Sequence, residues 1–235
     1  NLNSLDTAQL RFGVTIINPA DVGLGFGIYS SQVLATAFAP LGSLAADFSD
    51  AGIDPDPNAN GNPADTGESD PTVINYTVPV IGVAKQASVS DGLVTFDFFI
   101  RTLGQVPLTM VSVIDDFVSV FGAGNYQILP PPALIGPPRG LTPNPNFDGG
   151  GNTQLIAPGS TLAPSVQEQI RVVIRVLTPT DQGSGFGVYS NQAAASSFQG
   201  LSDLSDAGTN PDPNGNGSPA DPGENDPTAF TVLAA

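Results

Sequence analysis

The stretch VTFDFFIR at residues 94–101 alternates apolar and polar side chains with the period of two that is typical of a β-strand. Its apolar set is Val94, Phe96, Phe98 and Ile100. The stretch IRVVIRV at residues 170–176 shows the same alternation, with the apolar set Ile170, Val172, Ile174 and Val176. We therefore expect two strands whose apolar faces meet in a shared core.

Further strands are expected from the patterns on either side of these two. They are placed near residues 81–89, 107–115, 124–129, 186–198 and 228–233, and no segment has the periodicity of a helix. About seven short strands over roughly 100–150 residues indicate an all-β protein made of immunoglobulin-like antiparallel β-sandwich repeats. The alternative is a jelly roll, which needs an eighth strand from residues 150–160.

The chain contains an internal repeat. LRFGVTIINPAD at residues 10–21 matches IRVVIRVLTPTD at 170–181, and GFGIYSSQ at 25–32 matches GFGVYSNQ at 185–192, both at an offset of 160. We expect the parent protein to be a longer array of such units.

This repeat predicts the domain organisation. Residues 1–80 correspond to the C-terminal half of a β-sandwich repeat, with strands near 8–17, 25–38 and 72–79, whereas residues 81–235 form a complete repeat. The apolar face of the half repeat then has no partner sheet in its own unit; it consists of Leu10, Phe12, Val14 and Ile16. We expect neighbouring repeats or other copies of the protein to complete it, head to tail.

An acidic stretch also occurs twice in the chain, at an offset of 156 residues. It reads SDAGIDPDPNANGNPADTGESDPT at residues 49–72 and SDAGTNPDPNGNGSPADPGENDPT at residues 205–228. Counted from Asp47 and its counterpart Asp203, the two copies hold 13 of the 22 acidic residues and no Lys or Arg. Like charges at this density repel one another unless a cation enters the loop.

The oxygen-bearing side chains of the two copies are the candidate calcium ligands. In the first copy they are Asp50, Asp54, Asp56, Asn58, Asn60, Asp65, Glu68 and Asp70. In the second copy they are Asp206, Asn210, Asp212, Asn214, Asn216, Asp221, Glu224 and Asp226. Counted from Asp54 or Asn210, both copies have oxygens at the relative positions 1, 3, 5, 7 and 12 of a loop that wraps calcium.

The likeness to an EF-hand is partial. Gly stands at position 6 only in the second copy, as Gly215, and position 12 is Asp rather than Glu. Four prolines exclude a helix in the first copy, namely Pro55, Pro57, Pro63 and Pro71. We expect a non-helical calcium loop, similar in style to the acidic runs of thrombospondin type 3 repeats. The alternative is a solvated linker that uses the same residue types as turn formers.

Composition excludes several classes of function. The net charge is −16 with only six Lys and Arg residues, which argues against nucleic acid or an anionic membrane as a partner. His and Cys are absent, so the usual nucleophilic triads and zinc sites cannot form, and we expect no enzymatic activity. No apolar run reaches the roughly 18 residues that would predict membrane insertion.

Lys85 is the only lysine of the chain and lies on the expected first strand. Adhesin sandwiches with an intramolecular Lys–Asn isopeptide bond place their lysine on that strand. We do not expect such a bond from a single lysine.

The order of motifs in 81–235 resembles the conserved repeat domain of large bacterial cell-surface proteins, catalogued as a domain of unknown function. The most specific motifs are the turn GQVPL at residues 104–108 and the terminal acidic loop. The resemblance implies a secreted or surface-anchored tandem β-sandwich protein of the adhesin or extracellular-fibre kind. A longer Pro-rich stretch at residues 129–144 departs from the family pattern.

Two functions fit these expectations. The first is a structural module, a stalk or filament subunit that calcium makes rigid and that lies outside the cell or at its surface. The second is a calcium-dependent module that binds a carbohydrate or a surface. We favour the first, because Trp is absent and Tyr29 and Tyr189 occupy the same position of the repeat, which suits a structural role.

Overall fold

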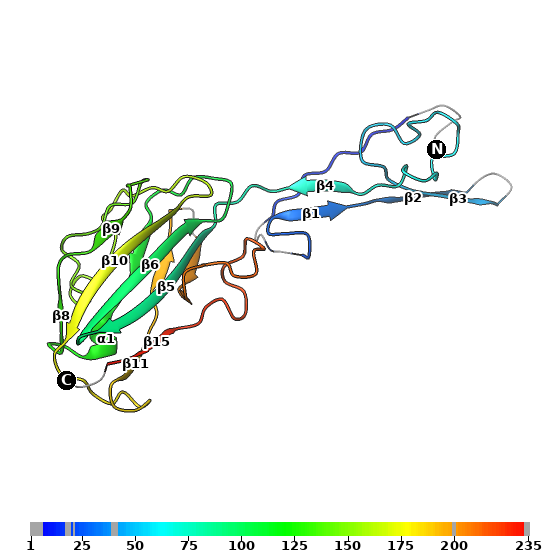
Figure 1. Cartoon of the computed structure of the whole chain (residues 1–235). Coiled ribbons are helices and arrows are strands. Elements are labelled where there is room, and N and C mark those ends of the chain that lie inside the picture. Colours follow the sequence, from blue (N-terminus) through cyan, green and yellow to red (C-terminus); the bar gives the residue numbers. More distant parts are fainter. Residues whose placement is uncertain (1–6, 17–19, 21, 39–41, 199–200, 233–235) are drawn as a thin grey trace.

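The computed structural model describes residues 7–16, 20, 22–38, 42–198 and 201–232. The chain is 37% strand and 2% helix, which confirms the all-β expectation. Figure 1 shows a body that begins at strand β5 and an arm, containing β1 to β4, that extends away from it.

Three strands of ten residues each form the centre of the largest sheet: β5 (Ile81–Ser90), β6 (Leu93–Thr102) and β10 (Gln167–Val176). Short strands complete this sheet: β8 (Tyr126–Ile128) and β9 (Ala133–Ile135) pair with β10, and β14 (Asp206–Ala207) pairs with β5. Every pairing in the sheet is antiparallel except that of β14 with β5.

The expected shared core is confirmed. β6 and β10 are adjacent, with Phe98 opposite Ile170 and Phe96 opposite Val172, so their apolar residues lie on one face of the sheet. All eight of these side chains are buried, at 0–8% exposure: Val94, Phe96, Phe98, Ile100, Ile170, Val172, Ile174 and Val176. The period-two pattern therefore gave the correct face of both strands.

Shorter strands lie against this face as a second layer. β7 (Ser112–Ile114), β12 (Ala194–Ser196) and β13 (Ser202–Leu204) form a three-stranded sheet. β11 (Val188–Asn191) pairs with β15 (Thr228–Thr231). The strand expected at 186–198 is therefore divided between two sheets. Residues 150–160, from which a jelly roll would need its eighth strand, form isolated bridges and no strand.

The sequence did not predict helix α1 (Phe117–Phe121). Asp116 caps its N-terminus by accepting a hydrogen bond from the Ser119 N–H, and Gly122 follows it with a φ of 82°. Phe117 and Phe121 lie one turn apart and are both fully buried among other aromatic rings. Capping and core packing therefore produce one helical turn that has no periodicity of its own in the sequence.

The arm contains two antiparallel strand pairs. β1 (Ile28–Ser31) pairs with β4 (Thr72–Asn75), and β2 (Leu34–Phe38) pairs with β3 (Leu44–Phe48). These pairs have counterparts in the body, where β11 pairs with β15 and β12 pairs with β13.

The strand expected at residues 8–17 is not present in the described part of that range, residues 8–16. Its counterpart, β10, has β6 on one side and β8 and β9 on the other. Residues 7–16 have no strand of this kind beside them. A strand requires a neighbour for its backbone hydrogen bonds, so the alternating pattern alone does not produce one.

Candidate functional site

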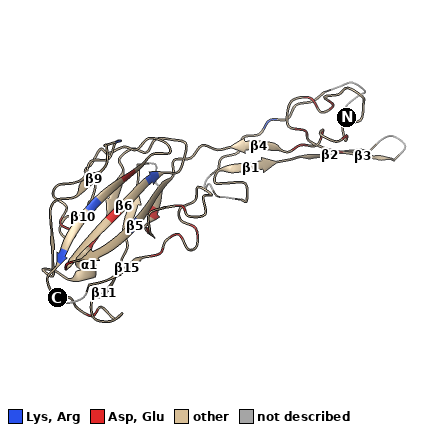
Figure 2. Ribbon diagram, viewed as in Figure 1, with Lys and Arg blue, Asp and Glu red and all other residues tan. Residues whose placement is uncertain are grey.

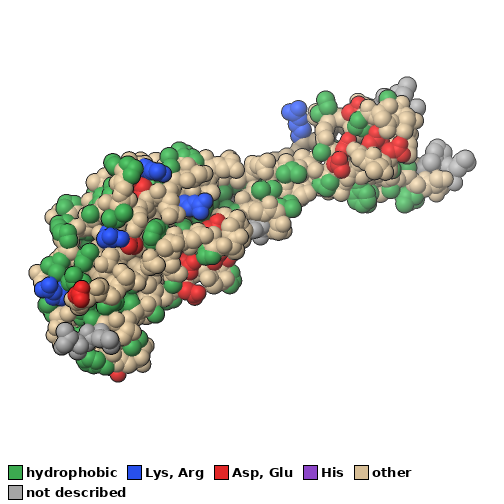
Figure 3. Space-filling view, in the orientation of Figure 1, with side chains coloured by type: hydrophobic (Ala, Val, Ile, Leu, Met, Phe, Trp, Pro, Cys, Tyr) green, Lys and Arg blue, Asp and Glu red, His purple; other side chains and the backbone are tan. Residues whose placement is uncertain are grey.

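The two acidic loops connect matching strands. The first, residues 49–71, joins β3 to β4, and the second, residues 205–227, begins after β13, includes β14 and ends at β15. Figure 2 shows that acidic residues concentrate in these loops, whereas several of the few basic residues lie on the strands of the body. Figure 3 shows the acidic side chains of the first loop clustered on the arm, and others gathered where the arm meets the body.

A glutamine holds the two ends of each loop together. In the first loop, Gln32 Nε2 donates hydrogen bonds to the carbonyl oxygens of Ser49 at 3.3 Å and Ser69 at 2.6 Å. The matching bonds in the second loop, at 3.2 and 2.6 Å, run from Gln192 Nε2 to the carbonyl oxygens of Ser205 and Asn225. The two loops therefore share their anchoring geometry as well as their sequence.

A tyrosine on β1 and one on β11 fix the strands that pair with β4 and β15, which follow the loops. The Tyr29 hydroxyl accepts a hydrogen bond from the Ala20 N–H at 3.0 Å, and the Tyr189 hydroxyl accepts one from the Thr180 N–H at 2.8 Å. Both bonds reach nine residues upstream, as in the tyrosine corner of sandwich domains.

Two aspartates organise the interior of the first loop. The Asp56 carboxylate accepts hydrogen bonds from the backbone N–H groups of Asn60 at 3.2 Å and Gly61 at 2.8 Å. The Asp65 carboxylate accepts hydrogen bonds from the side-chain amides of Asn60, at 2.6 Å, and Asn62. These bonds bring the centre of the predicted ligand set into one place.

The second loop has the same arrangement. The Asp212 carboxylate accepts hydrogen bonds from the N–H groups of Gly215 and Gly217, both at 3.1 Å. The Asp221 carboxylate accepts bonds from the Asn216 amide at 2.7 Å and the Ser218 hydroxyl at 2.9 Å.

The structure thus brings together the central members of each predicted set. They are Asp54, Asp56, Asn58, Asn60, Asp65 and Glu68 in the first loop, and Asn210, Asp212, Asn214, Asn216, Asp221 and Glu224 in the second. The outer members lie apart from them. Asp50 caps the neighbouring Ala51 N–H, and Asp206 lies on β14 near Asp226. Asp70 is exposed and has no hydrogen bond to the central set.

Matching carboxylate oxygens remain buried without a hydrogen-bond partner in both copies. They are Oε2 of Glu68 and Glu224, and Oδ1 of Asp47 and Asp203. A buried unpaired carboxylate oxygen is costly, and a bound cation would relieve that cost. Asp47 and Asp203 were not among the expected ligands, although their alignment at the same offset was a signal for them.

Asp203 shows this cost in its ionisation. Burial raises the pKa of its carboxyl group to about 8, although hydrogen bonds from the backbone N–H groups of Val83 and Leu204 lower it. Repulsion from Asp206 and Glu224 raises it further. Burial also raises the pKa of Glu224, with Asp212 and Asp221 adding to the effect. Asp203 and the second loop together therefore concentrate negative charge that favours either protons or a cation.

Calcium coordination stays a prediction. In the residues that the structure describes, no group of three or more acidic side chains is arranged closely enough to hold a metal ion. Many of the expected ligand oxygens instead accept backbone N–H bonds within Asx-type turns, as the linker alternative requires. A calcium ion would have to draw the Asp and Glu oxygens inward from these positions.

No family model and no curated protein matches the chain. No helix in the described ranges is long and apolar enough to cross a membrane.

Proposed function

We propose that the chain is a structural module of a secreted or surface-anchored repeat protein, as an adhesin stalk or the subunit of an extracellular filament. Its repeats would be immunoglobulin-like β-sandwiches, and calcium in the acidic loops would stiffen the joints between them. The proposal rests on the resemblance to the conserved repeat domain of bacterial surface proteins and on the contrast between the arm and the body.

That contrast is the observation that carries the proposal. Leu10, Phe12 and Val14 of the arm are 92%, 77% and 76% exposed. Their counterparts in β10 are Ile170, Val172 and Ile174, each at 0% exposure. The same sequence pattern therefore builds a core in the body and an uncovered apolar face in the arm. Exposed apolar faces of this kind mark interaction sites.

A charged residue shows the same contrast. In the body, Arg171 makes a bidentate ion pair with Asp97 on β6, with both distances at 2.8 Å. Arg11 is its counterpart in the arm and has no ion-pair partner among the described residues. A strand equivalent to β6 would supply both the apolar cover and the acidic partner. We therefore propose that the occupant of the arm is a segment like residues 81–166 from another repeat of the same protein.

The second acidic loop lies at the joint between the arm and the body. The Phe26 N–H of the arm donates a hydrogen bond to the Asn216 carbonyl of the loop at 3.2 Å, and Gly217 lies close to the Phe26 side chain. Asp212 and Asn216 also line a cavity with Gly25 and Tyr76 of the arm. Calcium in this loop would limit the orientations that the arm can take.

A hybrid chain tests the proposal directly. Thr7 is the counterpart of Gln167, so residues 81–166 can be placed immediately before residue 7 to give one complete repeat followed by another. We expect residues 8–16 to become a strand whose amide hydrogens exchange slowly, and the hybrid to unfold with a larger cooperative unit. The control is the same hybrid carrying Phe12→Asp. Equal exchange rates in the arm of the hybrid and of the original chain would contradict the proposal.

The carbohydrate-binding alternative would require an exposed aromatic platform. Tyr189 is buried, and Tyr126 donates its hydroxyl hydrogen to the Asp148 carbonyl. The Tyr29 hydroxyl accepts a hydrogen bond from the Ala20 N–H. Tyr76 is 42% exposed. Calcium-dependent retention on a panel of polysaccharides would favour this alternative over the structural module.

A further inference from the structure

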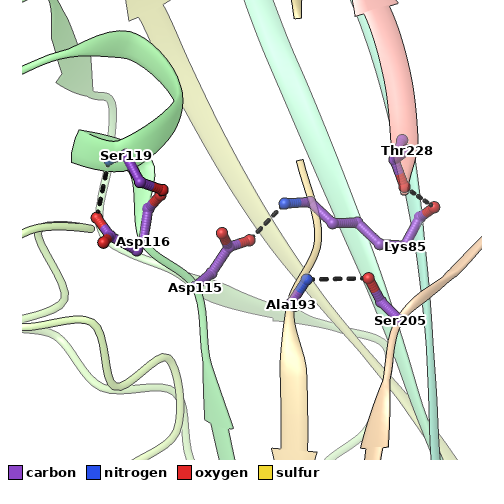
Figure 4. A network of polar contacts seen from close by, with 7 residues as sticks. All are labelled: Lys85, Asp115, Asp116, Ser119, Ala193, Ser205 and Thr228. Atoms are coloured by element: carbon purple, nitrogen blue, oxygen red, sulfur yellow. Dashed lines mark hydrogen bonds and ion pairs between the residues drawn. The ribbon is translucent and has the colours of Figure 1, made fainter. Parts of the chain in front are cut away.

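The core of the body contains one charged pair. Lys85 on β5 is 0% exposed, and its Nζ contacts Oδ2 of Asp115, which is 1% exposed and directly follows β7. Figure 4 shows the two side chains pointing toward each other between the sheets. Neither residue belongs to the acidic loops. A buried ion pair of this kind is costly to desolvate and is weak evidence for a role in stability alone.

A carboxamide completes the group. Asn191 ends β11, is 3% exposed and faces the same side of its strand as Tyr189, into the core. It lies opposite Thr228 in the β11–β15 pair, and the Thr228 hydroxyl donates to the Lys85 carbonyl at 2.8 Å. The Asn191 side chain also lies close enough to Asp115 to lower the pKa of its carboxyl group, against the larger effect of burial.

Two atoms of this group have no hydrogen-bond partner among the described residues. They are Nδ2 of Asn191 and Oδ1 of Asp115, and both are buried. Lys85, Asp115 and Asn191 thus place an amine, a carboxyl group and a carboxamide together in a site with unsatisfied polar atoms. Such atoms are rare in folded proteins, and a reactive site is one explanation for them.

We propose that Lys85 and Asn191 are joined by an amide bond that the folded chain forms by itself, with Asp115 as the group that transfers the protons. This proposal does not depend on the proposed function of the chain. Its three residues lie outside the arm and the acidic loops, although Ala207 of the second loop pairs with Lys85 and the Gly208 N–H donates a hydrogen bond to the Lys85 carbonyl at 2.9 Å.

The surroundings favour the forms of the three groups that this reaction needs. Burial lowers the pKa of the Lys85 amine, although Asp115 opposes the effect, and burial raises the pKa of the Asp115 carboxyl group against the effect of Lys85. Both directions favour a neutral amine beside a carboxylic acid. Aromatic rings exclude water from the amine, with Nζ 4.2, 4.9 and 5.3 Å from the ring centres of Phe96, Phe98 and Phe117. A neutral amine is the nucleophilic form.

The reaction balances without another reactant. Nζ of Lys85 attacks Cγ of Asn191 and forms the new C–N bond, while the Asp115 acid protonates Oδ1 of Asn191. The Asp115 carboxylate then removes a proton from Nζ and delivers it to Nδ2. The Cγ–Nδ2 bond breaks, ammonia leaves, and the Oδ1 proton returns to Asp115 as the carbonyl re-forms. Asp115 ends in the state in which it began.

The internal repeat contains a natural variant of this position. GFGIYSSQ at residues 25–32 and GFGVYSNQ at residues 185–192 differ only at Ile28/Val188 and at Ser31/Asn191. Ser31 occupies the same place in the β1–β4 pair that Asn191 has in the β11–β15 pair. The strand pair therefore forms with serine at this position as well, although Ser31 is exposed and Asn191 is buried. The carboxamide occurs in the copy that also has a buried lysine.

Mass spectrometry of the denatured full chain gives the first measurement. We expect a mass lower than that of the sequence by one ammonia. Asn-Gly sequences can lose ammonia as well, by forming a succinimide, and the chain has three of them, at Asn60, Asn214 and Asn216. A map of tryptic peptides is therefore needed to locate the loss.

The single lysine makes this map simple. The cleavage sites of trypsin are Lys85 and the five arginines, Arg11, Arg101, Arg139, Arg171 and Arg175. We expect no cleavage after Lys85 and a branched product in which peptide 12–101 is joined to peptide 176–235. Free peptides 12–85 and 86–101 from the folded wild-type chain would overturn the proposal. A product joining peptide 12–101 to peptide 102–139, with loss of water, would assign the bond to Asp115 and would also overturn it.

Substitutions identify the roles of the residues. Asn191→Ser, which introduces the residue found at position 31, is expected to restore the sequence mass and full cleavage after Lys85. The matched control, Asn75→Ser at the exposed end of β4, is expected to keep the branched product. Asp115→Asn should leave the bond unformed in a chain whose circular dichroism is that of a β protein. Formation of the bond at the wild-type rate in Asp115→Asn would contradict its assignment as the proton carrier.

Discussion

Phe96 lies at the centre of the aromatic core. It is fully buried, and its ring centre is 5.2 Å from those of Phe117 and Phe230. Phe96→Ala removes these contacts and leaves a cavity, so we expect the free energy of unfolding to fall by about 3–5 kcal/mol in urea titrations. The control is Phe186→Ala, since Phe186 is 62% exposed, and we expect a change within about 0.5 kcal/mol. Similar losses in both variants would contradict the assignment of the core.

Asp203 makes the stability of the calcium-free chain depend on pH. Its pKa of about 8 in the folded chain lies above the value of 3.8 expected without burial. Folding therefore favours the protonated form, and this stabilising contribution is complete below about pH 4 and is lost as the pH rises to about 8. In EDTA we expect the free energy of unfolding to fall over this range by on the order of 5 kcal/mol, since each unit of pKa shift corresponds to about 1.4 kcal/mol.

The variant Asp203→Asn isolates this contribution. An amide cannot ionise, yet its oxygen can still accept the 2.7 Å hydrogen bond from the Val83 N–H. We expect the pH dependence of the variant to be flatter than that of the wild type, whereas the control Asp181→Asn keeps the wild-type slope. Parallel stability curves for wild type and Asp203→Asn in EDTA would show that burial of Asp203 has no such effect.

The turn between β5 and β6 is a two-residue hairpin turn. Asp91 and Gly92 connect the two strands and have φ angles of 52° and 72°, as a two-residue turn of type I′ requires. The Cβ added by Gly92→Ala has no atom within 4 Å, so the substitution is unfavourable only because of the positive φ. We expect the free energy of unfolding to fall by about 1 kcal/mol in thermal or urea unfolding. Asp91→Asn should be neutral, because Asn tolerates positive φ. A neutral Gly92→Ala would contradict the assigned turn.

The strands that the sequence predicted best are those that bury one face along their whole length. β6 and β10 agree with the expected positions because alternation is strict where one face meets a core. Residues 8–16 show the limit of this reasoning. They have the same alternation as β10 but no neighbouring strand. The pattern therefore shows that the segment is able to form a strand, but a strand forms only where another strand pairs with it. Helix α1 was not predicted because it has only five residues, which is too short for a helical period to be visible in the sequence.

The candidate sites differ in the same way. The acidic loops could be identified from sequence because their residues are close along the chain and are repeated. Their hydrogen bonds could not, because the same Asp and Asn residues serve either as ligands or as turn formers. The buried group of Lys85, Asp115 and Asn191 comes from three separate strands or strand ends. Only the folded chain brings an amine, a carboxyl group and a carboxamide together.

Across the whole molecule, the two acidic loops have different positions and so predict different consequences. The first lies within the arm, whereas the second contacts Phe26 at the joint with the body. If each binds calcium with the dissociation constant of about 10⁻⁴–10⁻³ M typical of extracellular modules, a tenfold excess adds about 1.4 kcal/mol per site. We expect the melting temperature to rise by several degrees in millimolar calcium and to return in EDTA. An unchanged melting temperature, with no bound metal by elemental analysis, would contradict calcium binding.

Single substitutions separate the two loops. Asp212→Ala removes a 6%-exposed carboxylate that caps Gly215 and Gly217 at the joint, so we expect it to weaken the calcium response of the body and to widen the range of arm orientations seen by small-angle scattering. Asp56→Ala should loosen the first loop alone, because that loop lies beyond β1 and β4 and its described hydrogen bonds remain within the arm. Asp181→Ala is the control, because its carboxylate caps Gly183 and Gly185 outside both loops. Since only Asp212 lies at the joint, equal effects of the three substitutions on calcium affinity and on arm motion would refute both the ligand assignment and the role of the second loop.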